Sequence, residues 1–178
     1  MIQYCKRCCL PSTKPHLSFD EEGICNACRN YENRKNVDWD ERKKELMEIL
    51  DRYRSKDGSN WDCIIPVSGG KDSTYQVITM LELGMNPLCV TATTCDLTDI
   101  GRRNIENIKK MGVDYIEVTT NRVVRAKLNR IGLTEVGDIS WPEHVSIFTV
   151  PVRMAVNFNV PLIIWGENSQ NEYGGPAA

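Results

Sequence analysis

The sequence has 178 residues, of which 41% are hydrophobic and 26% charged, and it carries a net charge of −2 with a pI near 5.8. This composition excludes an intrinsically disordered chain, and the length is enough for one buried core with a small appendage. No apolar stretch approaches the ~20 residues of a membrane span, and no signal-peptide profile opens the chain, so we expect a cytoplasmic protein. Because proteins that hold long nucleic acids are usually basic, such a partner is not expected.

The residue pattern divides the chain into three zones. Residues 1–36 are rich in cysteines and turn formers, 37–60 predict a linker helix and a polar loop, and 61–178 alternate apolar runs with helical periodicity. Such alternation predicts an α/β fold, a doubly wound parallel sheet with helices on both faces and ligands beyond the carboxyl ends of its strands. The predicted strands are 63–67, 88–93, 115–118 and 161–165, and the predicted helices are 39–55, 72–83, 100–111, 121–131 and 146–158.

Four of the eight cysteines form two pairs with the spacing of metal ligands. Cys5 and Cys8 make one pair, Cys25 and Cys28 make the other, and sixteen residues lie between the pairs. Two such pairs complete a tetrahedral shell of thiolates with no open position, so the spacing predicts a structural zinc knuckle. An iron–sulfur cluster uses similar ligands and is an alternative that the spacing leaves open.

A glycine-rich loop follows the first predicted strand of the α/β zone. The residues Ser68-Gly69-Gly70-Lys71-Asp72-Ser73 join that strand to a helix. Paired glycines let backbone amides approach an anion at a helix N-terminus, Lys71 adds a positive charge, and the serines offer hydroxyl donors. The loop is not a Walker motif, whose glycine spacing is longer. We predict a phosphate-binding loop; the structural alternative is a tight turn in which Asp72 or Ser73 caps the helix.

This loop resembles the signature of the PP-loop ATP pyrophosphatases, and the whole chain resembles the N-acetyl sugar amidotransferases within that superfamily. The resemblance implies that ATP is cleaved between its α and β phosphates to activate a sugar's acetamido oxygen as an adenylate, so that ammonia can form an acetamidino group. Acetamidino sugars of this kind belong to lipopolysaccharide O-antigen and flagellin biosynthesis. Family members are longer, which implies that a C-terminal region of the sugar site is missing here. The matching stretches are Cys5-Lys6-Arg7-Cys8-Cys9-Leu10-Pro11, residues 19–28 (FDEEGICNAC), Gly101-Arg102-Arg103-Asn104 and residues 165–175 (WGENSQNEYGG).

The resemblance also implies roles for individual residues. Lys71, Asp72 and Glu167 are the expected catalytic residues. The residues expected to bind ATP or pyrophosphate are Ser68, Gly69, Gly70, Lys71, Asp72, Ser73, Thr93 and Asn104.

Further polar residues extend this expected site. Glu167 follows the last predicted strand, where a carboxylate is placed to hold Mg²⁺ between phosphate oxygens. Asn168 and Glu172 are candidates for the magnesium or substrate site, and so is His144, in a predicted loop. A polar loop with capping side chains is the structural alternative for the acidic residues, and a satisfied structural role is the alternative for the histidine.

The other cysteines and one basic run have simpler interpretations. Cys9 is a spare beside the metal ligands, Cys63 and Cys89 lie inside predicted strands as small core residues, and Cys95 at a strand end is placed near the site. The run of basic residues on the helix 121–131 is interpreted as a solvated face, with a nearby anionic substrate as the alternative. This run contains Arg122, Arg125, Lys127 and Arg130.

The expected partners follow from what the chain lacks. No cysteine lies in a strand elbow of the G-x-C-x-G type, so we expect a separate glutaminase to supply ammonia. The expected substrate is an N-acetyl sugar, either a nucleotide sugar or a nonulosonic acid. One alternative function is tRNA thiolation by a PP-loop enzyme, although no paired cysteines follow Cys95. A second alternative is a non-catalytic zinc-knuckle interaction module.

Overall fold

The computed structural model describes residues 1–93 and 97–166. The chain forms two compact units, one containing Met1–Leu46 and the other Met47–Gly166. The boundary lies within the helix α2, which spans Trp39–Tyr53 and corresponds to the predicted linker helix.

The second unit is built on a parallel sheet. Its strands are β1 (Cys63–Pro66), β2 (Pro87–Thr93) and β3 (Asp114–Thr119), in the order β1-β2-β3. The predicted strand 161–165 forms a parallel bridge on the other side of β1, where the Ile64 amide donates to Leu162 O and the Ile164 amide donates to Ile64 O, both at 2.9 Å. The order of strands therefore reverses beside β1, as in a doubly wound sheet.

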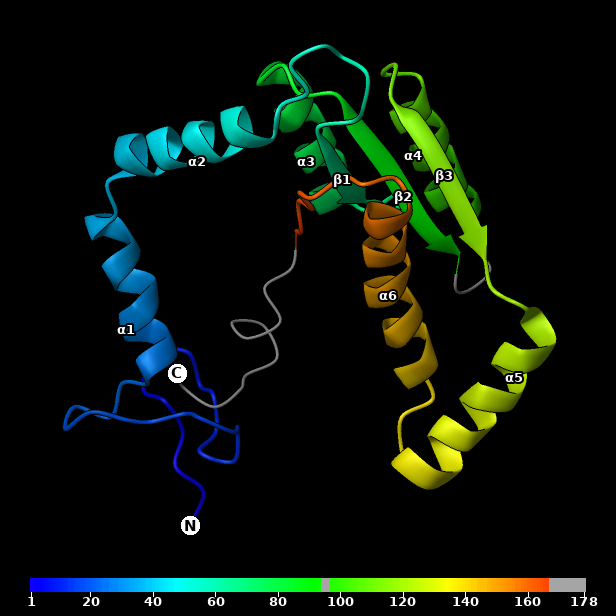
Figure 1. Cartoon of the computed structure of the whole chain (residues 1–178). Coiled ribbons are helices and arrows are strands. Elements are labelled where there is room, and N and C mark those ends of the chain that lie inside the picture. The colour runs from blue at the N-terminus through cyan, green and yellow to red at the C-terminus, as the bar shows by residue number, and fades with distance from the viewer. Residues whose placement is uncertain (94–96, 167–178) are drawn as a thin grey trace. The chain divides into compact units, whose positions relative to one another are not determined.

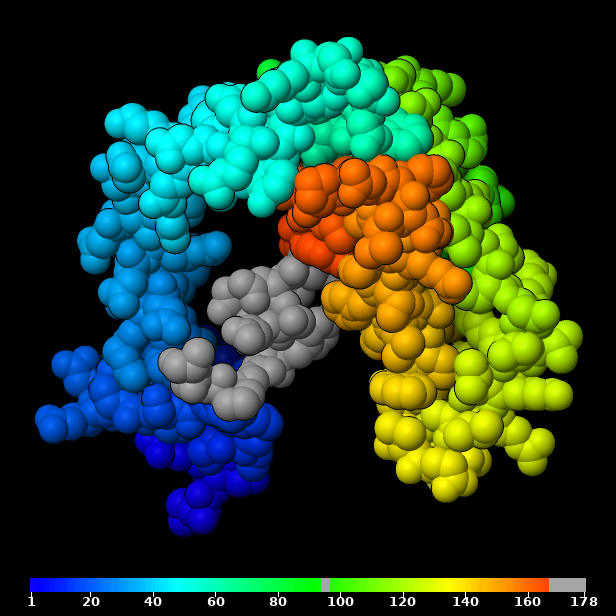
Figure 2. Space-filling model, in the orientation of Figure 1, coloured from blue at the N-terminus to red at the C-terminus, as the bar shows by residue number. Residues whose placement is uncertain are grey.

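Helices cover both faces of this sheet. The chain forms α3 (Lys71–Glu82), α4 (Asp99–Lys109), α5 (Arg122–Ile131) and α6 (Trp141–Asn157), with a π-helical turn, η2 (Gly132–Val136), before α6. In Figure 1, α6 crosses one face of β1 and β2 while α3 and α4 lie on the opposite face. Side chains of α6 and of the following residues hide that face of the sheet in the space-filling view (Figure 2).

The core follows from the two-residue period of the strands. Ile64, Leu88 and Val90 are buried against Ala155 and Val160, which belong to α6 and the segment after it. The alternate residues Cys63, Ile65 and Cys89 are also fully buried, as a strand covered on both faces requires. The prediction that Cys63 and Cys89 are core residues is confirmed.

The ends of two helices show where local sequence signals predict a helix boundary correctly and where they do not. The helix predicted over 72–83 ends just before Gly84, which has φ +72°, and the amides that follow α3 donate to the carbonyl oxygens of Leu81 and Met80. By contrast, α6 begins at Trp141 instead of 146, because Pro142 occupies its first turn. His144 is therefore an exposed residue of a helix, and its placement in a loop was wrong. None of the helices in the described ranges combines the length and the apolarity that crossing a bilayer takes.

The first unit consists of tight turns and short helices. Antiparallel bridges join Tyr4 to Pro11 and Phe19 to Cys25. The helix α1 (Asn26–Asn33), which the sequence analysis does not predict, starts directly after Cys25, and a 3₁₀ turn, η1 (Arg34–Asn36), follows it.

Candidate functional site

The loop of residues 68–73 lies at the carboxyl end of β1. The Val67 amide donates to Val90 O at 2.8 Å, which anchors the start of the loop to β2, and α3 begins at Lys71. The N-cap of α3 is Gly70, and no side chain caps the helix. The structure therefore does not form the alternative in which Asp72 or Ser73 caps the helix. The first backbone amides of α3 are available to bind an anion or water.

Gly69 and Asn104 fix the shape of this loop. Gly69 has φ +78°, and a Cβ there would lie 2.8 Å from the carbonyl oxygen of Gly101 in α4. The Asn104 side-chain amide, also from α4, donates to Gly69 O at 2.9 Å. Asn104 therefore positions the loop from behind, a role that the sequence resemblance does not specify.

Lys71 and Asp72 lie at the open mouth of the loop. The Lys71 ammonium contacts both Asp72 carboxylate oxygens, at 2.6 and 2.8 Å, and the two side chains are 88% and 71% exposed. Exposed ion pairs contribute little to stability, at most about 1 kcal/mol. Lys71 can therefore exchange this partner for a phosphate at small cost.

A second polar cluster lies beside the loop, at the carboxyl ends of β2 and β3. The Thr93 hydroxyl donates to Glu117 Oε1 at 2.6 Å, and Arg102 Nη1 lies 3.0 Å from both Glu117 oxygens. The Thr93 hydrogen bond, followed by the Arg102 contacts, lowers the pKa of Glu117 from its ordinary value. Sequence reasoning missed Glu117; its only signal was an acidic residue inside an apolar strand.

This cluster gives a prediction with a defined pH dependence. Because the folded-state pKa of Glu117 is lowered, its stabilising contribution is full above the unfolded-state pKa of about 4.3 and is lost as the pH falls through the folded-state value. Glu117→Gln should therefore lower the free energy of unfolding by about 1 kcal/mol at pH 7. The difference between the two proteins should shrink as the pH is lowered from 7 to 3, as urea titrations at both pH values can measure.

Glu106→Gln is the matched control for this measurement. Glu106 is an exposed acid that pairs with Lys109 one helical turn away on α4, so its loss should change stability by about 0.5 kcal/mol or less. A difference between Glu117→Gln and the native protein that stayed constant from pH 7 to pH 3 would contradict the assigned ion pair.

Several predicted site residues lie outside the described ranges or have a role that stays a prediction. Glu167, Asn168, Glu172 and Cys95 are outside the described residues, so their placement near magnesium or substrate stays a prediction. His144 lies in the first turns of α6, and its candidate role in the magnesium or substrate site stays a prediction. The last described residue, Gly166, approaches α3 closely, since a Cβ there would lie 2.8 Å from Gln76 Nε2.

The four paired cysteines converge on one point in the first unit. Their sulfur atoms all lie within 4.8 Å of one another, with 4.0 Å between Cys5 and Cys28 and 3.5 Å between Cys8 and Cys25. A tetrahedral zinc with Zn–S bonds of ~2.3 Å separates its sulfurs by about 3.8 Å. The residues therefore fit a closed four-thiolate metal site.

Backbone amides support this site electrostatically. Amides of Cys8, Arg7 and Cys25 point at the Cys5 sulfur and lower the pKa of that thiol to about 6, whereas burial raises the pKa of Cys28 to about 12. A cation among the four sulfurs favours the thiolate form of each. Cys9, with φ +61°, is exposed and is not one of the four converging residues.

The comparisons with known proteins bear on the fold. The structure of NMN synthetase from Francisella tularensis matches 73% of this chain and 55% of its own chain, with a TM-score of 0.53 and 14% sequence identity. At that identity the likeness establishes the fold alone, and it supports the predicted α/β architecture; the four-cysteine cluster lies near the N-terminus.

Sequence comparison adds one relative. An uncharacterised protein of Methanocaldococcus jannaschii is 31% identical over 99 residues, which are 55% of this chain and 35% of that protein. The chain thus spans about a third of this curated relative and about half of the solved structure. No family model matches the chain.

Proposed function

We propose that this protein binds ATP with the triphosphate on residues 68–73 and cleaves it to AMP and pyrophosphate. The observation that carries this proposal is the uncapped N-terminus of α3 behind Gly69 and Gly70, with Lys71 exposed beside it. Free amides and a lysine at a helix N-terminus provide both the hydrogen bonds and the charge that phosphate oxygens require. The PP-loop type of fold supports the same location.

The reaction that we propose is the amidation of a sugar's acetamido group. The amide oxygen attacks the α-phosphorus of ATP, the bond to the bridging oxygen breaks, and pyrophosphate leaves. Ammonia then adds to the amide carbon, and the tetrahedral intermediate loses a proton and expels AMP to give the acetamidino group. Activation is needed because an amide carbonyl is a poor electrophile and its oxygen a poor leaving group.

The described residues have separate parts in this proposal. Lys71 and the α3 amides balance the charge that develops on pyrophosphate, and Asn104 holds the loop carbonyl in place. Asp72, whose carboxylate lies at the loop mouth, is proposed to contact Mg²⁺, which would neutralise phosphate charge. Glu167, Asn168 and Glu172, outside the described residues, are proposed to complete this site.

The nitrogen source is part of the proposal. Ammonia must arrive as the neutral molecule, since ammonium has no lone pair for the attack, and we propose that a separate glutaminase supplies it. With ammonium salts in place of that partner, pyrophosphate release in the presence of an N-acetyl sugar should increase as the pH rises toward the ammonium pKa. Glutamine alone should yield no product until a glutaminase is added.

Replacing Lys71 tests the phosphate loop directly. Lys71→Ala removes a charge-assisted contact worth on the order of 1.5–3 kcal/mol, so ATP should bind about 10- to 150-fold more weakly by calorimetry. Lys56→Ala, in the exposed loop before β1, is the matched control and should bind ATP like the native protein. Unchanged ATP and pyrophosphate affinity in Lys71→Ala would remove the basis of the proposal. Cleavage of ATP stimulated by tRNA instead of a sugar would replace amidation by thiolation.

A further inference from the structure

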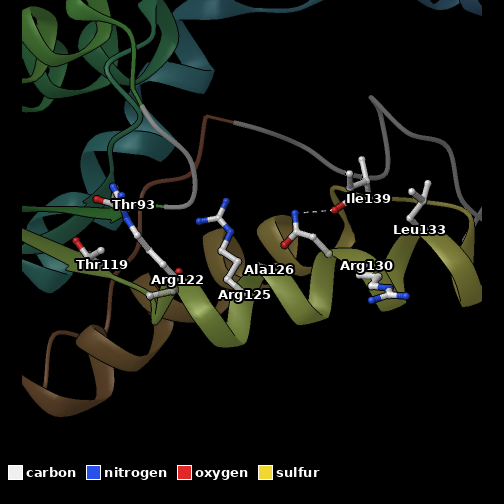
Figure 3. Close-up of a pocket in the computed structure, with 10 residues that line it drawn as sticks. Thr93, Thr119, Arg122, Arg125, Ala126, Arg130, Leu133 and Ile139 are labelled. Carbon is white, nitrogen blue, oxygen red and sulfur yellow. Dashed lines mark hydrogen bonds between the residues drawn. The ribbon is translucent and has the colours of Figure 1, made fainter.

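A pocket of about 550 Å³ lies at the carboxyl edge of the sheet, the edge from which the loop of residues 68–73 also extends. Its volume falls in the range of small-molecule sites, and none of the residues 68–73 lines it. Figure 3 shows its lining side chains, which come from the ends of β2 and β3, from α5 and from the turns after α5. The pocket is lined by Thr93, Thr119, Thr120, Arg122, Arg125, Ala126, Asn129, Arg130, Leu133 and Ile139.

The charged side chains among the described residues that line this pocket are arginines. Of these ten residues three are arginines and none is acidic, while Glu143 contacts Arg125 and Glu117 contacts Thr93. Arg125 is held by Glu143 of α6 at 2.5 Å and is only 15% exposed, so one guanidinium is fixed in the wall. In Figure 3 the Arg122 side chain extends from the start of α5 toward Thr93, at the strand ends. The arrangement fits a group that carries negative charge, such as a phosphate or a carboxylate.

The pocket also has unsatisfied polar atoms. Thr120 Oγ1 and Asn129 Oδ1 are shielded from water and have no hydrogen-bond partner among the described residues. The Asn129 amide nitrogen, in contrast, donates to Ile139 O at 3.0 Å. Buried polar groups in folded proteins are nearly always paired. The hydroxyl groups of a sugar have the donors and acceptors that these two atoms lack.

The far side of the pocket is apolar and open. Leu133 and Ile139 are 53% and 54% exposed, which is high for large aliphatic side chains facing a cavity. A small apolar group on the ligand, such as the methyl of an N-acyl substituent, would cover part of this surface. One cavity thus offers contacts for an anionic group, for hydroxyl groups and for a small apolar group of a ligand.

We propose that this pocket binds the acceptor of the reaction as an acidic N-acyl sugar, with Arg122, Arg125 and Arg130 supplying the positive charge that its phosphate or carboxylate requires. The inference rests on the proposed function for the identity of the acceptor, but the anion site itself does not require ATP to bind. Because the loop of residues 68–73 and the arginine pocket share no residue, the two anions occupy separate subsites at one edge of the sheet.

The test is calorimetry on residues 1–178 with three probes. N-acetylglucosamine 1-phosphate and N-acetylneuraminic acid carry a phosphate and a carboxylate, and neutral N-acetylglucosamine carries neither. At least one acidic sugar should bind at least about tenfold more tightly than the neutral sugar, and the tighter of the two identifies the anionic group. The proposal is overturned if neither acidic sugar binds more tightly than the neutral one.

Variants locate the binding within the pocket. Arg122→Gln and Arg130→Gln should each weaken the acidic sugar by about tenfold, because each removes one charge-assisted contact. Lys127→Gln removes a charge from the same helix outside the pocket. It should change the affinity for the acidic sugar less than about twofold, because solvent screens the interactions of exposed charges. These three variants should bind ATP like the native protein, whereas Lys71→Ala should lose affinity for ATP and keep its affinity for the sugar. Arginine variants that bind the sugar normally, or that lose ATP to the same extent, overturn the proposal.

Discussion

Replacing Gly69 with alanine is expected to weaken ATP binding strongly and to destabilise the second unit. Two penalties coincide at this position. The backbone has φ +78°, which costs a residue with a side chain about 1–2 kcal/mol, and the new Cβ would lie 2.8 Å from the Gly101 carbonyl oxygen, a backbone atom that cannot move aside alone. Either the loop or α4 must shift, and both define the phosphate site. We expect ATP affinity to fall at least about 100-fold, or about 2.7 kcal/mol, by calorimetry.

Gly58→Ala separates the two penalties. Gly58 also has a positive φ, +68°, but nothing lies within 4 Å of its virtual Cβ. In Gly58→Ala only the conformational cost applies, so the free energy of unfolding in urea should fall by about 1–2 kcal/mol and ATP should bind normally. If Gly69→Ala bound ATP as tightly as Gly58→Ala does, the close approach of α4 would not matter for the loop, and the assigned geometry would be wrong.

The sequence predicts the α/β unit well because local and periodic signals agree there. Apolar runs of strand length locate β1, β2 and β3, and Gly84 ends α3 where a left-handed residue is needed. The start of α6 was placed too late, because Pro142 looks like a breaker in sequence but is accommodated in a helical first turn. The sequence does not predict the helix α1, because this helix has no buried residue and therefore no apolar stripe.

The candidate site is only partly readable from sequence. The loop of residues 68–73 and the four paired cysteines are local motifs. In the structure the loop leads into α3 at Lys71, and the four cysteine sulfurs converge. The hydrogen bond from Asn104 to Gly69 and the pairing of Glu117 with Arg102 join different elements, so no spacing rule reports them. The basic run on α5 is visible in the sequence, where it is interpreted as a solvated face. Only the tertiary structure distinguishes its arginines, which line the pocket, from Lys127, which does not.

Replacing Cys25 and Cys28 together with serine is expected to remove one zinc ion per chain and to unfold the knuckle. Apart from the knuckle sulfurs, the first unit has little to hold it, since Cys5 and Cys25 are its only fully buried hydrophobic residues among those described. Structural zinc contributes about 10–16 kcal/mol to folding in zinc-finger peptides, more than turns of this size supply by themselves. Elemental analysis should find about one zinc in the native protein and none in the variant.

The readouts of this experiment distinguish the knuckle from the α/β unit. The Arg7 and Cys25 amides, which point at the Cys5 sulfur at 3.4 and 3.3 Å, should lose their protection from hydrogen exchange. Amides of β1 and β2 should keep theirs, because their core lies within Met47–Gly166. Cys9→Ser is the matched control and should retain the metal, since Cys9 is exposed and outside the cluster. Iron in place of zinc would identify an iron–sulfur cluster on the same ligands, whereas a double variant that kept its metal and its protected amides would show that these cysteines do not bind it.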